Sequence, residues 1–281
     1  MKTQFNGILD EWGDDDGPTL ELPAQQLPIP RNGRNTNVML FHNVALKSSQ
    51  RPFDTLGGAK AFAQQIEVYH RELDREGAIA LAPLEMAEPI LSGGKFYVMN
   101  AVKTVLGPNL MDLRGPELRA AVGEIIWSIR LMEPYQADPS QQPSPNKLKR
   151  GFDSTGGNFI VSPNVPPVHD YSLVRDRQGR MLSRAGTPVG IDYDPPYLRG
   201  RDSEFLLGMA DGDRAFRNRA YGTRTGAIAN LLLTGLYMAE HPNGADPQSW
   251  QAFYNEWREL VPADMHDQVA QDIDWLINWR P

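Results

Sequence analysis

The sequence predicts an α+β protein whose strands and helices are segregated along the chain. Strand-like patterns and a single helix occupy residues 37–107, whereas residues 108–281 are mainly helical, with a short strand pair embedded. Runs of strands followed by runs of helices are typical of α+β folds, and a doubly wound parallel sheet would need regular alternation. We therefore expect a bilobal protein, with a small β-rich lobe containing one helix and a larger helical lobe.

Composition narrows the possible functions. The chain has 281 residues, enough for one large domain or two smaller lobes with a buried core. Its formal charge of -7 offers no general attraction to nucleic acid or an anionic membrane, so neither is an expected partner. There is no cysteine, which excludes thiol catalysis and fits a reducing cytoplasm. The acidic N-terminus lacks an apolar core, so we expect neither a signal peptide nor, elsewhere, a membrane span.

The first lobe is predicted from residues 37–107, after an irregular arm at residues 1–36 that is rich in Pro, Gly, Asn and Asp. Residues 37–48 have the β-rich apolar content of one strand, or of two strands with a tight turn between them. Residues 55–77 place apolar side chains at helical spacing and close with a glycine, which predicts a helix. In residues 88–105, two apolar runs flank Ser-Gly-Gly-Lys, which is a hairpin signal.

The second lobe is predicted to begin with a long amphipathic helix that has Pro116 near its start. A loop rich in Pro, Ser and Gln follows, and then two short apolar strands at residues 158–162 and 188–194. The polar insertion between these strands contains a hairpin signal, Asp-Arg-Gln-Gly-Arg. Three further stretches have a helical apolar period, namely residues 225–241, 247–260 and 264–279.

Polar side chains flank the two short strands of the second lobe. Asp153 lies in the loop before the first strand, Asn158 opens that strand, and Asp192 and Asp194 lie at the end of the second. Carboxylate and amide oxygens are hard ligands suited to Mg²⁺, and an acid kept off the metal can accept a proton from a hydroxyl nucleophile. Phosphoryl transfer needs both functions. The alternative is a plain turn, because Asp, Ser and Gly dominate turns and Gly156 and Gly157 would let the backbone turn tightly.

The spacing Asp153-x4-Asn158, the following strand and the later Ile-Asp-Tyr-Asp resemble the catalytic core of the protein-kinase-like superfamily. The closer resemblance is to its small-molecule branch, the aminoglycoside phosphotransferase and choline kinase group. It implies a kinase-like fold and an ATP- and Mg²⁺-dependent phosphotransferase acting on a hydroxyl of a small molecule or a peptide. It also implies that Asp153 is the catalytic base, that Asn158 and Asp192 are metal ligands, and that Asp194 fills the second acidic position.

In the first lobe, Val-Ala-Leu-Lys resembles the kinase strand motif Val-Ala-Ile-Lys, which implies that Lys47 holds the α- and β-phosphates of ATP. Lys95 and Lys103 are its rivals on neighbouring strands. The following helix would supply the glutamate that pairs with this lysine. Glu67 is the candidate, although another alignment places Gln65 at that position. Residues 100–110 resemble the hinge that holds adenine.

The chain also departs from the family pattern. Gly151 and Phe152 occupy the positions of the family's His and Gly, so the loop before Asp153 must be held differently. No glycine-rich phosphate loop precedes Lys47. These departures support an alternative from another class, a pseudokinase that uses the fold to bind or scaffold a partner protein or peptide. A hydrolase is less favoured, because the chain has no Gly-x-Ser-x-Gly motif.

Overall fold

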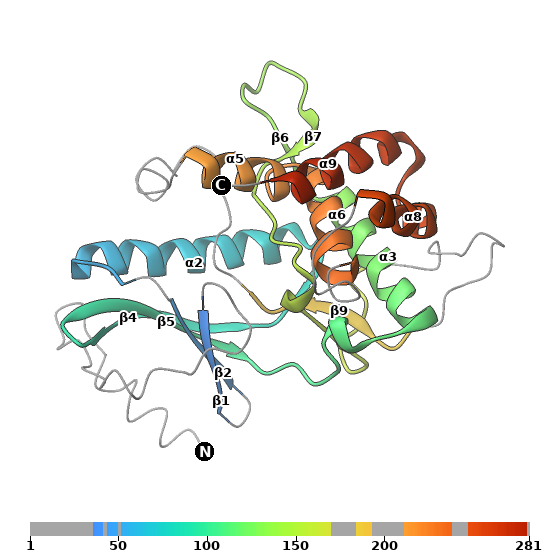
Figure 1. Ribbon diagram of the computed structural model, residues 1–281. Helices are drawn as coiled ribbons and strands as arrows, with labels where there is room; N and C mark the ends of the chain where they lie inside the picture. Colours follow the sequence, from blue (N-terminus) through green and yellow to red (C-terminus); the bar gives the residue numbers. More distant parts are fainter. Residues whose placement is uncertain are drawn as a thin grey trace. The chain divides into compact units, whose positions relative to one another are not determined.

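The computed structural model describes residues 36–41, 44–49, 52–169, 184–192, 211–237 and 247–279 (Figure 1). The chain divides into two compact units. The first comprises Met1–His70 and Ala82–Thr104, and the second comprises Arg71–Leu81 and Val105–Pro281. Strands and helices are both present, and the sheets are small, as expected for an α+β protein.

The first unit contains a four-stranded antiparallel sheet in the order β1-β2-β5-β4. Its strands are β1 (Thr36–Phe41), β2 (Val44–Ser49), β4 (Leu84–Ser92) and β5 (Lys95–Lys103). The predicted strands and the hairpin at Ser-Gly-Gly-Lys are therefore confirmed. Gly93 and Gly94 have φ angles of 57° and 75°, the left-handed backbone that a two-residue hairpin of this type requires.

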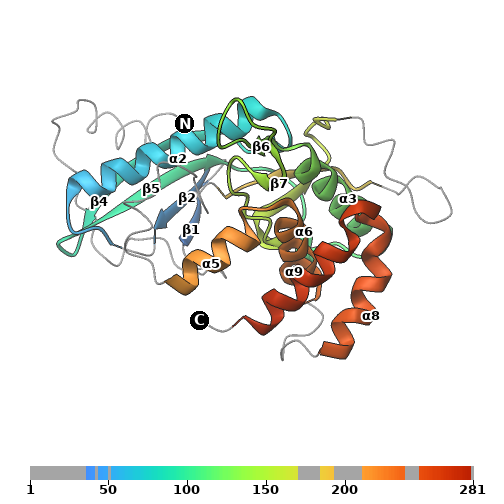
Figure 2. The same ribbon diagram turned by 90° about the horizontal axis from the view of Figure 1, so that it is seen from above.

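The predicted helix is confirmed as α2 (Leu56–Glu76), and from Arg71 onward it belongs to the second unit. In the first unit it lies along one face of the sheet (Figures 1 and 2). Its buried side chains lie three or four residues apart, as the apolar period predicted. They include Phe62, Ile66 and Tyr69.

The second unit contains a three-stranded sheet in the order β3-β9-β8, with β3 (Ala80–Leu81) parallel and β8 (Phe159–Ser162) antiparallel to β9 (Thr187–Gly190). β6 (Pro134–Tyr135) pairs with β7 (Ser144–Leu148). The predicted strand pair is therefore confirmed, although the second strand ends at Gly190. The hairpin predicted within the insertion lies outside the described residues, as do residues 1–35 of the N-terminal arm.

The helices of the second unit enclose its main apolar core, which takes buried side chains from α3, α6, α8 and α9. They confirm the predicted helical periods. The α-helices are α3 (Gly115–Leu131), α5 (Asp211–Ala220), α6 (Arg224–Leu232), α8 (Pro247–Trp257) and α9 (His266–Asn278). A π-helical turn, η5 (Leu233–Tyr237), continues α6. The 3-10 turns are η2 (Leu110–Asp112), η3 (Gly156–Asn158), η6 (Arg258–Leu260) and η7 (Ala263–Met265).

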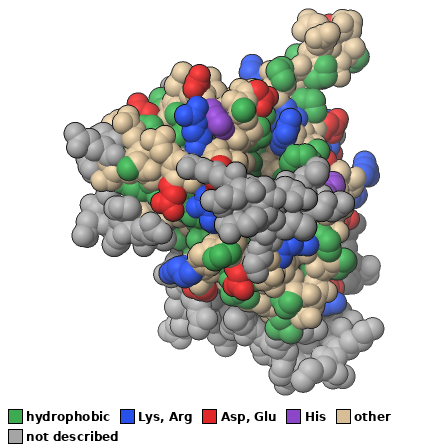
Figure 3. All heavy atoms as spheres, turned by 90° about the vertical axis from the view of Figure 1, so that its right-hand side faces the viewer, with side chains coloured by type: hydrophobic (Ala, Val, Ile, Leu, Met, Phe, Trp, Pro, Cys, Tyr) green, Lys and Arg blue, Asp and Glu red, His purple; other side chains and the backbone are tan. Residues whose placement is uncertain are grey.

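One face of the molecule carries side chains of both charges. On the face drawn in Figure 3, Lys and Arg side chains are interspersed with Asp and Glu side chains over the coloured part of the surface. Of the helices that the structure describes, none has the length and apolar character needed to cross a bilayer.

Candidate functional site

Strand pairing brings Asn158 and Asp192 to the same end of the β8–β9 pair. Phe159 is opposite Gly190 in this antiparallel register, so the residues just outside the strands also face each other. The backbone N–H of Ile191 donates to the carbonyl oxygen of Asn158 at 3.0 Å. Asn158 and Asp192 are both half-buried. Asn158 is therefore joined by a backbone hydrogen bond to Ile191, the residue next to Asp192, although Asn158 and Asp192 are 34 positions apart in the sequence.

Asp153 lies in the loop before η3 and is also half-buried. Its Oδ1 accepts hydrogen bonds from the backbone N–H of Thr155 at 3.0 Å and from the Thr155 hydroxyl at 2.6 Å. Burial raises the pKa of Asp153, and the nearby Asp192 carboxylate raises it further, while Thr155 and Arg217 oppose the rise. The loop at Asp153 does form the plain turn that was the alternative interpretation. The Asp153 carboxylate in this turn is also close enough to Asp192 for the two charges to affect each other.

The loop before Asp153 is held without the histidine that the kinase-like resemblance implies at this position. Phe152 is buried, and its ring packs on that of Phe159 with the centroids 6.0 Å apart. Its backbone N–H donates to the carbonyl oxygen of Tyr221 at 2.9 Å, and Leu148 donates in the same way to Gly222 at 3.0 Å. The segment that leads to Asp153 is therefore anchored by an aromatic contact and by the backbone that follows α5.

Gly156 has a packing role rather than a conformational one. Neither Gly156 nor Gly157 has a positive φ, so the tight turn does not need the left-handed conformation that glycine permits. A Cβ added to Gly156 would lie 2.4 Å from the Cα of Gly235 and 2.7 Å from the Sδ of Met111. The loop can approach the π-helical turn η5 because Gly156 has no side chain.

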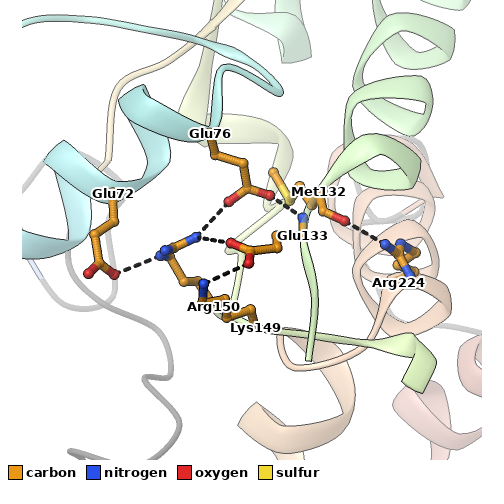
Figure 4. A network of polar contacts seen from close by, with 7 residues as sticks. All are labelled: Glu72, Glu76, Met132, Glu133, Lys149, Arg150 and Arg224. Atoms are coloured by element: carbon orange, nitrogen blue, oxygen red, sulfur yellow. Dashed lines mark hydrogen bonds and ion pairs between the residues drawn. The ribbon is translucent and has the colours of Figure 1, made fainter. Parts of the chain in front are cut away.

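Upstream of Asp153, Arg150 lies among three carboxylates (Figure 4). Its guanidinium donates to Glu72 at 2.7 Å, to Glu76 at 2.9 Å and to Glu133 at 3.3 Å. Lys149 pairs with Glu133 at 2.6 Å. Glu72 and Glu76 come from the last turns of α2, within the second unit. We call these five residues the Arg150 network; it ties the end of α2 and the β6 strand region to the chain entering the Asp153 loop.

In the first unit, Lys47 lies on β2 opposite Asn100 of β5 and is only 5% exposed. The two alternative lysines, Lys95 and Lys103, are both exposed, and Lys95 forms an ion pair with Asp54 at 2.7 Å. Lysine is rarely buried in proteins without a partner group, so burial distinguishes Lys47 from the other two. Glu67 is exposed on α2, whereas Gln65 is half-buried. Asp194 lies outside the described residues.

Sequence reasoning missed two residues of the second unit that contact the Asp153 loop or act on its charge. Asn230 of α6 donates to the hydroxyls of Ser154 and Thr155, at 3.3 and 3.4 Å. Arg217 of α5 lies close enough to Asp153 to lower its pKa. A polar residue inside the apolar run Ala-Ile-Ala-Asn-Leu-Leu-Leu was the available signal for Asn230, whereas an arginine in a polar helix gives none.

The donor set fits a magnesium ion that is shared with phosphates. Asn158 and Asp192 supply an amide oxygen and a carboxylate at the same strand end, and both are hard oxygen ligands. Mg²⁺ commonly takes one or two carboxylates and completes its shell with water and substrate phosphates. Among the described residues, no group of three or more His, Cys, Asp or Glu side chains could hold a metal by itself.

Comparisons with known proteins give little further guidance. No protein-family model matches the chain, and no curated protein matches it. Several solved structures resemble it, among them the GDP and kanamycin complex of APH(2'')-IIIa. That likeness covers 92% of this chain and 98% of the other, with 11% sequence identity and a TM-score of 0.38. Similarity at this level establishes neither a common fold nor a common activity.

Proposed function

We propose that the protein is a kinase-like phosphotransferase that moves the γ-phosphoryl group of ATP to a hydroxyl, with Asp153, Asn158 and Asp192 as its site. The observation that carries the proposal is the β8–β9 pairing, which brings Asn158 and Asp192 to the same end of the strand pair, together with the charge interaction between Asp192 and Asp153. This arrangement supplies both a hard-ligand pair and a separate carboxylate, the division of labour that phosphoryl transfer requires.

Asp153 would serve as the base in this reaction. The acceptor oxygen forms a bond to the γ-phosphorus, and the bond from that phosphorus to the β–γ bridging oxygen breaks, so that ADP leaves with the electron pair. The acceptor proton passes to the Asp153 carboxylate. The raised pKa of Asp153, caused by its burial and by Asp192, makes it a stronger proton acceptor than an ordinary surface aspartate.

Asn158 and Asp192 would hold Mg²⁺, and Asp194 is proposed as a further ligand. When bound, the ion would neutralise phosphate charge. In the first unit, Lys47 is proposed to bind the α- and β-phosphates, and its burial on β2 supports this assignment over Lys95 and Lys103. Glu67 stays a prediction as the partner of that lysine, because it is exposed on α2. The acceptor is proposed to be a small molecule or a peptide.

The test compares the release of phosphate from γ-labelled MgATP, with water as acceptor, by the wild-type protein and two variants. Asp153→Ala should lower the rate constant by about 10²- to 10⁴-fold, since a general base is removed. Asp192→Asn should abolish the rise in Tm that ATP produces only when Mg²⁺ is present. Asp74→Asn removes the same kind of charge from an exposed site on α2 and should change neither value. Wild-type rates in both site variants would refute the proposal.

A pseudokinase is the second candidate, and the exposed position of Glu67 favours it, because the expected glutamate does not lie on the buried face of α2. The same measurements separate the two candidates. Stabilisation by MgATP without phosphate release would identify a nucleotide-binding module. The absence of both, with stable capture of a partner protein or peptide by the full chain, would support a scaffold.

A further inference from the structure

A chain of hydrogen bonds connects helix α6 to the Asp153 carboxylate. Asn230 is only 1% exposed, and its amide nitrogen donates to the Thr155 hydroxyl at 3.4 Å. That hydroxyl donates in turn to Oδ1 of Asp153 at 2.6 Å. The same amide nitrogen donates to the Ser154 hydroxyl at 3.3 Å, and Ser154 is completely buried. Three consecutive loop residues are thus linked to one helix residue.

The direction of every hydrogen bond in this series is fixed by the two groups that can only accept, the carbonyl oxygen of Ala227 and the carboxylate of Asp153. The Ser154 hydroxyl lies 2.6 Å from the carbonyl oxygen of Ala227, which can only accept, so the Ser154 proton must point there. Ser154 therefore accepts from Asn230, which requires the amide nitrogen, and not the amide oxygen, on this side of Asn230.

The hydrogen bonds of Thr155 are consistent with this orientation of the Asn230 amide. Because the amide nitrogen has only protons to offer, the Thr155 hydroxyl accepts from it and keeps its own proton for Asp153. A carboxylate accepts only, so this proton completes the chain without conflict. Nothing in the arrangement would let Thr155 donate to Asn230 instead.

The consequence is that the two oxygens of Asp153 are not equivalent. Both the N–H and the hydroxyl of Thr155 donate to Oδ1. Across the described ranges, no hydrogen bond is directed to Oδ2. We infer that Asn230 and Thr155 are positioning residues that orient the Asp153 carboxylate and leave Oδ2 as the atom that takes the acceptor proton. This inference rests on the proposed phosphotransferase function.

Such orientation matters because proton transfer requires the base to lie within hydrogen-bond reach of the acceptor hydroxyl. A carboxylate that loses one of its two tethers can rotate, and a displacement of about 1 Å can lower a rate about 10²-fold. Asn230 and Thr155 act only through Asp153, and the nucleotide is bound by other groups. The expected change therefore falls on kcat and not on the KM for ATP.

The experiment measures phosphate release from MgATP, with water as acceptor, by the full chain. Thr155→Val keeps the shape of the side chain and the backbone N–H but removes the hydroxyl, and we expect kcat to fall about 10- to 100-fold with an unchanged KM for ATP. Thr155→Ser restores the hydroxyl and should recover most of kcat. Thr234→Val is the matched control, because its hydroxyl donates at 2.7 Å to the backbone carbonyl of Asn230, outside the chain of bonds to Asp153.

The outcomes are distinct. An active wild-type protein with an unchanged kcat for Thr155→Val would overturn the inference, and so would equal losses in the Val and Ser variants. If Thr155→Val lowers the Tm, Thr155→Ala, which adds no atoms, gives the same comparison. A wild-type protein that releases no phosphate would instead refute the proposed function, and this inference with it.

Discussion

The Arg150 network and the Asp153 loop hold the same stretch of chain by different interactions. On one side of Phe152, Arg150 and Lys149 are paired with carboxylates, and Glu133 is 46% exposed in its side chain. On the other side, Ser154 and Asn230 are buried and joined by hydrogen bonds between neutral groups. Ion pairs near water are weakened by added salt and by a pH change that neutralises one partner. Buried contacts between neutral groups are weakened instead by the loss of a hydrogen bond or by a change in side-chain volume.

The acids in the two regions show the same contrast. Burial acts to raise the pKa of Glu133, but Lys149 and Arg150 outweigh it, so the pKa is lowered. For Asp153, burial prevails and the pKa is raised. One carboxylate is thus stabilised in its charged form, while the other is held as a better base. The surroundings of Glu133 therefore favour the ionised carboxylate, whereas the surroundings of Asp153, the proposed base, favour the neutral form.

The largest loss of stability is expected from Gly156→Ala, which adds a methyl group where Gly156 packs against Gly235. The added methyl group of Gly156→Ala would lie 2.4 Å from the Cα of Gly235, a backbone atom that cannot move without shifting η5. We expect the free energy of unfolding to fall by about 2–3 kcal/mol, as for overpacked cores. Denaturant unfolding measures this change, and phosphate release should fall as well, because the loop between Asp153 and Asn158 is displaced.

Gly157→Ala is the matched control for that variant. It changes the neighbouring residue in the same way, but no atom lies within 4 Å of the added Cβ and φ is not positive. We expect the free energy of unfolding to stay within about 0.5 kcal/mol of wild type. Equal losses in the two variants would show that glycine flexibility, rather than the contact with Gly235, is what the loop requires.

The sequence predicted the strands and helices and led to the candidate acids, but it did not indicate which contacts hold the Asp153 loop in place. Asp153, Asn158 and Asp192 are candidates because they lie beside two apolar strands and because their spacing resembles the kinase-like pattern, and both signals are local in the sequence. The bond from Arg150 to Glu72 spans 78 positions, and a charged residue in a polar stretch looks the same whether it is paired or solvated. The contact of Gly156 with Gly235 likewise depends on tertiary packing, which a glycine in a turn-like segment does not reveal.

An intermediate effect is expected at Arg150, whose side chain is 12% exposed. Arg150→Gln removes the positive charge that compensates three neighbouring carboxylates, those of Glu72, Glu76 and Glu133. We expect the free energy of unfolding to fall by about 1–2 kcal/mol, less than for a fully buried pair because two of the carboxylates are partly solvated. Thermal and denaturant unfolding at low salt measure the change.

Lys149→Gln provides the comparison for Arg150→Gln. It removes one positive charge from the neighbouring residue, whose pair with Glu133 is about half exposed on both sides. A pair of this kind contributes at most about 0.5 kcal/mol, and less at high salt. If Lys149→Gln were as destabilising as Arg150→Gln, the position of the guanidinium among three carboxylates would not be what matters.

The smallest effect is a pH dependence that comes from Glu133. Its pKa in the folded protein is below the usual value of 4.5, so its charged form contributes stability that is present above that value and is lost as the pH falls through the folded pKa. Glu133→Gln removes the charge but keeps an oxygen that can accept from Lys149 and Arg150. We expect the variant to be less stable than wild type at pH 7 by at most about 0.5 kcal/mol, because the side chain is about half exposed.

The difference between wild type and Glu133→Gln should shrink as the pH is lowered from 4.5, since the wild-type carboxylate then becomes neutral as well. Denaturant unfolding of both proteins at several pH values measures it, and the other titrating groups are common to the pair and cancel. A difference that grew on acidification would mean that burial, and not Lys149 and Arg150, controls this carboxylate. Glu133 would then resemble Asp153, and the contrast between the charged and the buried side of Phe152 would fail.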